Sequence, residues 1–425
     1  MNYKRAETPA RFLMRILLVH RYYSPDVGAY PAMLKIMAQR FVDEGHTVTV
    51  FSTQPGYNNV ATEKFPRRTE SDGVEVFRAW IMKEDKKKLL NRAFNVLLFA
   101  IQLIFHCLFR FRRYDLMTVA SFPPTVTAMV VRWLAWINGS RYLYHCQDIY
   151  PEIAQASGLI KRPWLSNLAL TIDRRNCRRA SAIVTLSKDM TDTLSKRGLS
   201  EQNMHVINNF IIDRCDPEIA IDDTLSKTPG KFRVLFAGNL GRFQHLDQLM
   251  LAAKHLREFD DIQFYFIGAG AMQSELEQMA TDEGLLDKTV FFRPFQPLEK
   301  VMRVIHESDL SIVSLAPGVI DCAYPSKTMS YVEAGCRILA VLEPASELAR
   351  LVEENDLGAV CKSSTVEGIS AAIESEYQRW KDVSYDRQRI RQKGEEFFGQ
   401  EAILQKWTSL LNQLKSNNGN GSKLV

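Results

Sequence analysis

The chain has 425 residues, which is too many for one hydrophobic core and suits two domains. A composition of 46% hydrophobic and 24% charged residues excludes a generally disordered chain. The formal net charge of +5 is too small for a general nucleic-acid binder, so we expect no nucleic-acid partner.

Two series of short β-rich runs alternate with helical stretches along the chain. The first series covers residues 15–19, 47–52, 74–80, 116–120, 141–145 and 182–186. The second series covers residues 232–238, 262–268, 289–292, 309–315, 337–342 and 358–361. Strands that alternate with helices form parallel sheets covered on both faces. The sequence therefore predicts an α/β fold of two doubly wound, Rossmann-like domains that face each other across a cleft.

The stretch 211–231 is acidic, carries Pro and Gly and lacks a clear period, so we place the domain boundary there. We expect an N-terminal domain over 14–215, a C-terminal domain over 231–395, a helix over 396–416 that packs back on the N-terminal domain, and a disordered tail over 417–425. The apolar run 16–19 is too short for a signal peptide. Residues 1–13 are expected to be a dispensable extension, because Met14 would itself make a natural start.

The turn after the first predicted strand, residues 22–29, contains one glycine. Gly28 allows the backbone to approach a ligand closely. The three-glycine fingerprint of dinucleotide-binding domains does not occur in this turn, which argues against NAD in this domain.

The segment 89–113 combines an apolar helix with basic flanks. Residues 93–109 are almost wholly apolar, and the polar side chains of Asn95, Gln102 and His106 share one helical face. The run is short for a full membrane span. Lys83, Lys86, Lys87, Lys88 and Arg92 stand at its start, and Arg110, Arg112 and Arg113 stand at its end. We expect a helix that lies in the headgroup region of an anionic membrane surface, with a core helix as the alternative.

Two residues follow the strand at 141–145 and are expected to face the cleft. Asp148 is a candidate catalytic carboxylate, because a carboxylate ahead of a Pro-capped helix needs a partner or a substrate. His145 has two open interpretations, a residue of the site and a satisfied core histidine.

The second domain opens with a strand followed by a loop that suits a phosphate. The loop contains Gly238, Asn239, Gly241, Arg242 and Gln244, and Arg242 could donate two hydrogen bonds to the anion. The next strand ends at Gly268, in a Gly-x-Gly sequence that by itself is common.

Residues 321–335 place a lysine at the start of a helix. Pro325 and Ser326 open the predicted helix and Gly335 ends it, so Lys327 lies in the first turn. Free backbone N–H groups, the positive end of the helix dipole and the lysine would together hold an anion, for which a diphosphate fits best.

The seven cysteines are scattered, without a Cys-x-x-Cys pair or a His pair at ligand spacing. This pattern is typical of reduced thiols in the cytosol, and we expect no metal site.

Together, these motifs resemble those of GT-B nucleotide-sugar glycosyltransferases of family 4, which are retaining enzymes. The chain is similar, more narrowly, to bacterial enzymes of the colanic-acid and O-antigen pathways. The matching pieces are Tyr23-Ser24-Pro25 through Gly28, Gln147-Asp148-Ile149-Tyr150-Pro151-Glu152, Gly238-Asn239-Leu240-Gly241 with Gln244, and Pro325-Ser326-Lys327 through Ala334-Gly335. His245 stands where the family has a glycine.

The chain departs from the family at two acidic positions. Many family members carry a Glu-x7-Glu motif, whose second glutamate binds the nucleotide ribose. Here the two positions are Cys322 and Ser330, so Ser330 would make a weaker ribose contact and Glu333 would compensate. The Arg and Lys of the family's phosphate loop are replaced by Asn239 and Gln244.

The resemblance implies a membrane-associated retaining glycosyltransferase at the cytoplasmic face of the membrane. The C-terminal domain would bind a nucleotide-diphosphate sugar as co-substrate, and the N-terminal domain would bind a polyprenyl-diphosphate-linked or other saccharide acceptor. Lys327, Arg242 and backbone N–H groups near Ser326 and Gly241 would stabilise the departing diphosphate without a metal or other cofactor. Other enzymes of the pathway are candidate partners. A nucleotide-sugar epimerase and an inactive membrane-recruiting subunit remain as alternatives.

Overall fold

The structure is a computed structural model. It covers residues 13–26, 28–55, 65–82, 89–109, 114–121, 125–156, 158, 160, 162–212, 214–382 and 385–416. Several predicted features lie outside these described residues, namely the extension over 1–12, the basic residues Lys83, Lys86, Lys87, Lys88, Arg110, Arg112 and Arg113, and the tail over 417–425.

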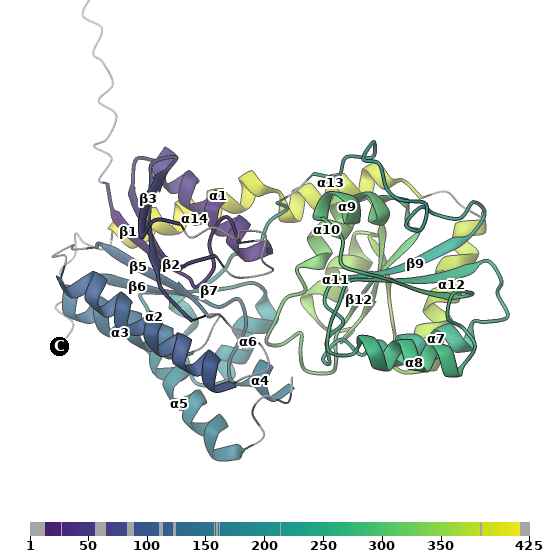
Figure 1. The fold of residues 1–425 in the computed structure, drawn as a ribbon, viewed down its shortest axis with the longest axis horizontal. Coiled ribbons are helices and arrows are strands. Elements are labelled where there is room, and N and C mark those ends of the chain that lie inside the picture. The colour runs from purple at the N-terminus through teal and green to yellow at the C-terminus, as the bar shows by residue number, and fades with distance from the viewer. Residues whose placement is uncertain are drawn as a thin grey trace, which may run out of the picture.

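The N-terminal domain is built on an eight-stranded sheet of order β3-β4-β2-β1-β5-β6-β7-β8 (Figure 1). The strands are β1 (Arg15–Val19), β2 (Thr47–Thr53), β3 (Arg68–Ser71), β4 (Val74–Ala79), β5 (Leu116–Ala120), β6 (Arg141–His145), β7 (Ala182–Thr185) and β8 (Met204–Val206). All neighbours are parallel except β3 and β4, which are antiparallel. The six predicted strands of this half are present, whereas β3 and β8 were not predicted.

Alternation along the central strand sorts the core of this domain into two layers. Ile16 and Leu18 of β1 face α1 (Ala29–Asp43) and α14 (Gln400–Ser416). Leu17 and Val19 face the opposite layer, which consists of the three helices α2 (Leu89–Phe109), α3 (Thr125–Asn138) and α5 (Pro163–Arg178). Both faces of the sheet are thus covered, which is the condition under which a parallel sheet is stable. The domain also contains α4 (Glu152–Ala156), α6 (Lys188–Lys196) and a 3-10 helix, Glu201–Asn203.

The C-terminal helix returns to the N-terminal domain, as expected. Helix α14 contributes Leu404 and Trp407 to the core beside α1, and the Trp407 ring lies 4.9 Å from the ring of His145. Arg40 of α1 pairs with Glu401 at 3.1 Å. The last element of the chain therefore ties the two domains together.

The C-terminal domain is built on a six-stranded parallel sheet of order β11-β10-β9-β12-β13-β14. Its strands are β9 (Phe232–Ala237), β10 (Ile262–Ile267), β11 (Val290–Arg293), β12 (Leu310–Ser314), β13 (Arg337–Val341) and β14 (Gly358–Val360). One face packs on α7 (Leu246–His255), α8 (Gln273–Asp282) and α12 (Val366–Asp382). The other face packs on α9 (Leu298–Glu307), α10 (Lys327–Glu333), α11 (Glu347–Glu354) and α13 (Arg387–Phe398). The predicted two-domain, doubly wound fold is therefore confirmed.

Candidate functional site

A cleft of about 360 Å³ lies between the two domains, at the carboxyl ends of their strands. It is lined by His20, Tyr22, Gly28, Ala29, Tyr30, Pro31, Gln147, Asp148, Asn209, Tyr324 and Ser326. Three of the predicted site residues, Gly28, Asp148 and Ser326, are brought together here from segments far apart in the sequence. Parallel sheets place their ligand sites at this edge, because the loops after the strands converge there.

Asp148 lies at the contact between the two domains. Its backbone forms a β-bridge with Ala323 of the C-terminal domain, and its N–H donates to Ser121 Oγ at 2.9 Å. Burial raises the pKa of the Asp148 carboxyl to about 6. No arginine or lysine pairs with this carboxylate among the residues that the structure describes. The carboxylate is thus ionised at neutral pH and faces a cleft that can hold a substrate.

A chain of hydrogen bonds forms the N-terminal wall of the cleft. The Gln147 and Asn209 amides pair with each other at 3.1 and 3.0 Å, and Gln147 Nε2 lies 2.8 Å from His145 Nε2. Burial lowers the pKa of His145 to about 3, so its imidazole is neutral and accepts from Gln147 at Nε2. Nδ1 then carries the proton and donates to the Tyr30 hydroxyl at 3.1 Å.

His145 therefore belongs to the core behind this wall, which settles the two interpretations left open by the sequence. The residues that sequence reasoning missed are Tyr30 and Asn209, which meet His145 and Gln147 only after folding. Gln147 stands in a quoted motif, but its amide gave no signal of a role in the wall.

Lys327 is the first residue of α10 and reaches the glycine loop after β9. Its Nζ lies 3.5 Å from the centroid of the Phe236 ring, and a Cβ atom on Gly238 would lie 4.0 Å from Nζ. The ammonium group is buried and has no hydrogen-bond partner among the described residues. Burial lowers its pKa to about 7. A buried amine without a partner is costly, so the site favours an anion that would supply one.

The loop that carries Gly238 is held by the loop after the neighbouring strand. Gly238 N–H donates to Ile267 O at 2.9 Å, and a Cβ on Gly268 would fall 2.0 Å from Gly238 O. Gly268 is buried in this contact, so the structure gives it a packing role and not the predicted contact with a ligand. Asn239 and Arg242 are exposed on the same loop, where they can reach a ligand.

Two further predictions need correction. The Gly241 N–H already donates to Gln244 Oε1 at 2.9 Å, so Gln244 shapes the loop and this amide does not point to a phosphate. Glu333 is buried and accepts from Arg214 at 3.1 Å, from Arg391 at 3.5 Å and from the Cys215 amide at 3.4 Å. Its carboxylate is therefore already engaged within the protein, which argues against the expected compensation at the ribose.

The residues at the family's acidic and glycine positions also have clear environments. Cys322 is buried, and its carbonyl accepts from Ile149 N–H at 2.8 Å across the domain contact. Ser330 is half-buried, one turn after Lys327. His245 has a φ of 48°, in the left-handed region that glycine favours, which explains why a glycine suits this position in related sequences.

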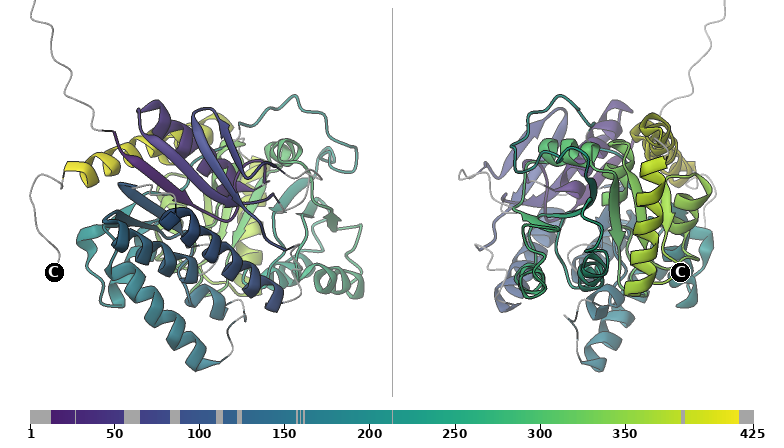
Figure 2. Two further views of the ribbon diagram at one scale, coloured as in Figure 1. Left: turned by 60° about the vertical axis from the view of Figure 1, so that its left-hand side comes forward. Right: turned by 90° about the vertical axis from the view of Figure 1, so that its right-hand side faces the viewer.

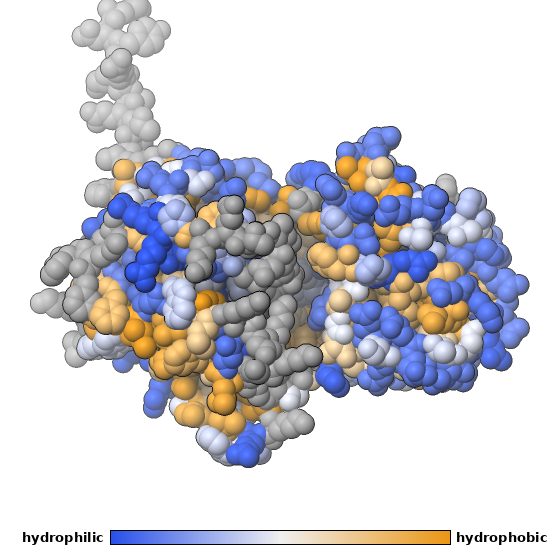
Figure 3. All heavy atoms as spheres, in the orientation of Figure 1, coloured by the Kyte–Doolittle hydropathy of each residue, from blue (hydrophilic) through white to orange (hydrophobic). Residues whose placement is uncertain are grey.

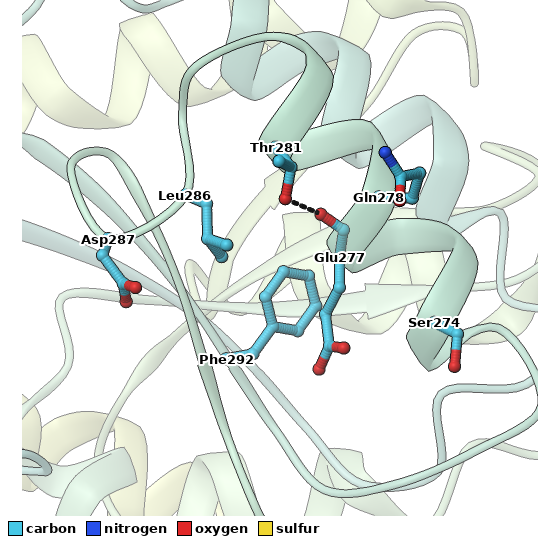
Figure 4. A pocket seen from close by; sticks show the side chains of 7 residues that line it. All are labelled: Ser274, Glu277, Gln278, Thr281, Leu286, Asp287 and Phe292. Carbon is cyan, nitrogen blue, oxygen red and sulfur yellow. Dashed lines mark hydrogen bonds between the residues drawn. The ribbon is translucent and has the colours of Figure 1, made fainter.

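A second hollow, of about 400 Å³, lies on the outer edge of the C-terminal domain between α8 and β11 (Figure 4). Its lining consists of Ser274, Glu277, Gln278, Thr281, Leu286, Asp287 and Phe292. The charged members are both acidic, and the hydrogen bond drawn there joins Thr281 to the backbone of Glu277 in the same helix. An acidic hollow without a cation does not fit a diphosphate, so we assign the functional site to the cleft between the domains.

Comparison with known proteins divides the chain in the same way as the structure. Residues 31–209 match the family model described as a glycosyl transferase 4-like domain. Residues 219–397 match the model described as glycosyl transferases group 1. Together the two models cover most of the chain, one for each domain.

Two bacterial relatives match over much of their length. The chain is 25% identical over 376 residues to WcaI of Escherichia coli strain K12, a glycosyl transferase named for colanic acid biosynthesis, and the match covers 85% of this chain and 91% of WcaI. It is 24% identical over 291 residues to WbjE of Pseudomonas aeruginosa, which is named as a glycosyltransferase, with 66% of this chain and 70% of WbjE covered.

Solved structures share the same two-domain arrangement. Sucrose-phosphate synthase from Thermosynechococcus elongatus superposes with a TM-score of 0.71 at 14% identity, covering 95% of this chain and 100% of that one. HepE of Anabaena, solved in complex with UDP-glucose, superposes with a TM-score of 0.65 at 16% identity, covering 94% and 100%. At these identities the likeness concerns the fold, which is GT-B.

Proposed function

The chain belongs to the glycosyltransferase family whose two domain models match it, and on this basis we propose that it moves a sugar from a nucleotide-diphosphate donor to a saccharide carried by a membrane lipid. The product would be part of a bacterial surface polysaccharide, because WcaI is named for colanic acid biosynthesis. We propose that the anomeric configuration is retained, as the resemblance to family 4 implies. The observation that carries the proposal is the buried Lys327 amine, which has no hydrogen-bond partner among the described residues and lies beside the Gly238 loop, one residue after Ser326 of the cleft lining.

We propose that the C-terminal domain binds the donor. Lys327, the exposed Arg242 and the Ser326 end of α10 would meet the diphosphate, while Asn239 and Ser330 would contact the rest of the nucleotide sugar. HepE, which has the same fold, is solved with UDP and with UDP-glucose, which supports a nucleotide-sugar donor here. Positive charge from Lys327 and Arg242 would stabilise the departing diphosphate in place of a metal.

We propose that the N-terminal wall binds the acceptor or the transferred sugar. The neutral groups of Tyr30, Gln147 and Asn209 can donate to and accept from sugar hydroxyl groups. Asp148 is the carboxylate placed among them, and it would orient or deprotonate a hydroxyl. A wall of neutral hydrogen-bonding groups suits a saccharide better than it suits a second anion.

We propose that the protein binds peripherally to the inner face of the cytoplasmic membrane through α2. Residues Leu90–Leu108 are long and apolar enough to cross a membrane, and only 33% of that window is buried within the protein. The polar side chains of α2 point inward. Asn95 bonds both the N–H and the C=O of Met82, at 2.9 and 3.0 Å, and Gln102 bonds both backbone groups of Trp80, at 3.0 and 2.7 Å.

These two side-chain amides attach α2 to the segment after β4, because each one bonds both the N–H and the C=O of a single residue there, as a paired strand does. The opposite face of α2 is apolar and exposed, and it carries Leu90, Phe94, Leu97, Ile101 and Phe105. A water-facing helix normally has the reverse pattern, with polar residues outward. The inverted pattern supports contact with lipid, which would also bring the enzyme to a lipid-linked acceptor.

Incubation with a panel of nucleotide sugars, with and without a polyprenyl-diphosphate-linked saccharide, tests this proposal. We expect release of nucleoside diphosphate that depends on the lipid acceptor, and NMR of the product should show the anomeric configuration of the donor. Conversion of the donor to its epimer without an acceptor would instead identify an epimerase. Donor binding without turnover under any acceptor would identify an inactive recruiting subunit.

A further inference from the structure

Helix α3 is apolar on both of its faces, which sequence analysis overlooked. Val131, Leu134 and Ala135 point into the core, as expected for a helix that covers a sheet. The outward side carries Trp133, Trp136 and Ile137, of which Trp136 is 77% exposed. The helix contains one charged residue, Arg132, and no acid. A helix that is hydrophobic all round is normally enclosed, yet this one has an open side.

The open side of α3 lies next to that of α2. Figures 1 and 2 show α2, α3 and α5 side by side beneath the sheet, with α3 between the other two. Among the described residues, seventeen large apolar side chains are exposed, and twelve of them lie on these three helices. Figure 3 shows this apolar surface as a band over α2 and α3 that continues towards α5. Such a concentration on one face of a single chain indicates a docking surface.

Helix α5 adds a third apolar group and a basic border. Its first turns expose Trp164, Leu165 and Leu168, with Trp164 59% exposed. Towards its end, Arg175 and Arg178 are exposed, followed by Arg179 just beyond the helix. These three arginines place positive charge beside the apolar band, at the end of α5.

No exposed carboxylate on α2, α3 or α5 offsets the positive charge of these arginines. The one carboxylate within α2, α3 and α5 is Asp173, which is buried and pairs with Arg197 at 2.7 Å. These three helices therefore present aromatic, aliphatic and cationic groups and no exposed acid. Exposed tryptophan on an apolar surface with arginine nearby is the pattern of a surface that lies in a lipid interface.

We propose that α3 and the start of α5 join α2 in one lipid-docking face, whose partner is the anionic phospholipid surface of a bilayer. This proposal rests on the membrane association proposed above and extends it. The membrane contact would include α3 and the start of α5 in addition to α2. Trp133, Trp136 and Trp164 insert their indoles at the level of the headgroups, and the arginines of α5 contact the phosphates. A face of this width fixes the orientation of the N-terminal domain on the membrane, whereas a single helix leaves it free to roll.

The same face begins beside the cleft. Burial raises the pKa of Tyr150, and the nearby charges of Asp148 and of Arg92 in α2 act on it in opposite directions. Arg92, at the start of α2, is thus within electrostatic range of Tyr150, in the segment that carries Asp148. A bilayer on this face would present a lipid-linked saccharide at the edge of the acceptor wall.

Binding of the full-length protein to vesicles tests the proposal without any measure of activity. The test variant is Trp133→Gln with Trp136→Gln and Ile137→Asn, which changes α3 and leaves α2 intact. Its matched control is Phe295→Ser with Leu298→Ser, which removes two exposed apolar side chains from the C-terminal domain. The vesicles contain phosphatidylcholine with or without phosphatidylglycerol. Circular dichroism and thermal melting establish that each variant is folded.

We expect wild-type protein and the control variant to sediment with vesicles that contain phosphatidylglycerol, and the α3 variant to bind at least about tenfold more weakly. Tenfold corresponds to 1.4 kcal/mol, which is less than two indoles contribute when they leave water. Trp164→Gln alone should weaken binding less. Lipids brominated near the headgroup should quench the tryptophan fluorescence of the wild type more than that of the α3 variant.

Two results would overturn the proposal. Equal binding by the folded α3 variant and the wild type would leave α2 as the whole membrane contact. A wild-type dimer that fails to bind vesicles, and that becomes a monomer in the α3 variant, would make this face an interface between two copies. Failure of the proposed sugar transfer is distinguishable from both, since vesicle binding is measured without a nucleotide sugar.

Discussion

The two domains share one architecture but differ in which groups lack a favourable environment: exposed apolar side chains in one domain and a buried amine in the other. In the C-terminal domain, α12 follows the usual rule, with Ile369, Ile373 and Tyr377 buried and Glu374 and Arg379 facing water. In the N-terminal domain, α2 and α3 break that rule by exposing apolar stripes. The C-terminal domain keeps its unsatisfied group behind the Gly238 loop, where the buried Lys327 ammonium lacks a hydrogen-bond partner among the described residues.

This difference shows that a parallel sheet needs helices on both faces, but that the sheet does not determine which side chains those helices expose to the outside. An outward apolar stripe is costly in water and an unpaired buried amine is costly in a protein interior, so each marks a place where something else binds. In our proposal the C-terminal domain therefore binds the donor, and the N-terminal domain binds the acceptor and the membrane. The following predictions test that division.

The largest effect is expected at Lys327. Lys327→Met keeps the apolar stem beside Phe236 and removes the charge, so turnover should fall by about two orders of magnitude, as on loss of one transition-state charge contact. Stability at pH 7 should not fall, since the variant removes a buried amine whose pKa is lowered. Steady-state kinetics and a thermal melt measure the two quantities. Wild-type turnover in the folded variant would remove Lys327 from the donor site.

The next effect concerns Asp148. Asp148→Asn keeps the shape of the side chain and removes its charge, so kcat/KM should fall by at least tenfold. Because the carboxyl has a pKa raised to about 6, wild-type activity that needs the carboxylate should decline as the pH falls through 6. The variant should lose this acid limb while donor binding, measured by calorimetry, stays unchanged. A loss of donor affinity in place of activity would contradict the division between the domains.

Donor affinity should depend on pH through Lys327. The pKa of this amine is lowered to about 7, so the free protein loses the positive charge as the pH rises through 7. Affinity for a nucleotide sugar should therefore weaken above pH 7, by up to about tenfold for each pH unit. Lys327→Arg keeps its charge and should bind with little dependence on pH between 7 and 9. An identical profile in both proteins would mean that Lys327 does not contact the donor.

A smaller effect is expected on the outer face of the N-terminal domain. Leu97→Ser, Ile101→Ser and Phe105→Ser change exposed residues of α2, so the protein should fold and become more soluble. Transfer to a lipid-linked acceptor should slow by several-fold, because the enzyme spends less time at the membrane. Hydrolysis of the donor by water should be spared, since we propose that the donor binds in the other domain. Equal slowing of both reactions would show that α2 supports the fold.

Much of the fold could be predicted because strands buried on both faces are continuous apolar runs. Residues 15–19 and 337–342 show this pattern, and both form interior strands of their sheets. The unpredicted β3, Arg68–Ser71, is a polar edge strand with one neighbour, so its pairing depends on β4 and leaves no apolar signal. The apolar character of α3 was readable in the sequence, but only the structure shows that half of it faces outward.

The candidate site could be predicted only where local sequence sets the geometry. Lys327 was found because Pro325 and Ser326 open a helix, and that fixes its place beside the loops. Glu333 was misjudged because spacing along a helix does not reveal that Arg214 and Arg391 occupy the carboxylate. Tyr30 and Asn209 were missed because their partners lie over sixty residues away and meet them only in the folded protein.

The smallest effect is expected where the two domains are held together. The first amide of α6, from Lys188, donates to the Glu347 carboxylate of α11, and the first amide of α11, from Glu347, donates to Asp189 Oδ2 at 2.8 Å. First-turn amides have no partner within their own helix, so each helix satisfies the other across the domain boundary. This reciprocal pair would favour the closed arrangement of the cleft.

Asp189→Ala removes one half of this pair. Loss of a helix-capping acceptor costs about 1 kcal/mol, so the closed population and kcat/KM should fall by no more than about fivefold. Small-angle scattering should show a larger radius of gyration, and the shift should shrink when a nucleotide sugar binds. Asp192→Ala is the matched control, because Asp192 pairs with Lys188 at 2.8 Å inside α6 and does not reach α11. If both variants scatter alike, the domains are held by the Asp148–Ala323 contact and by α14 instead.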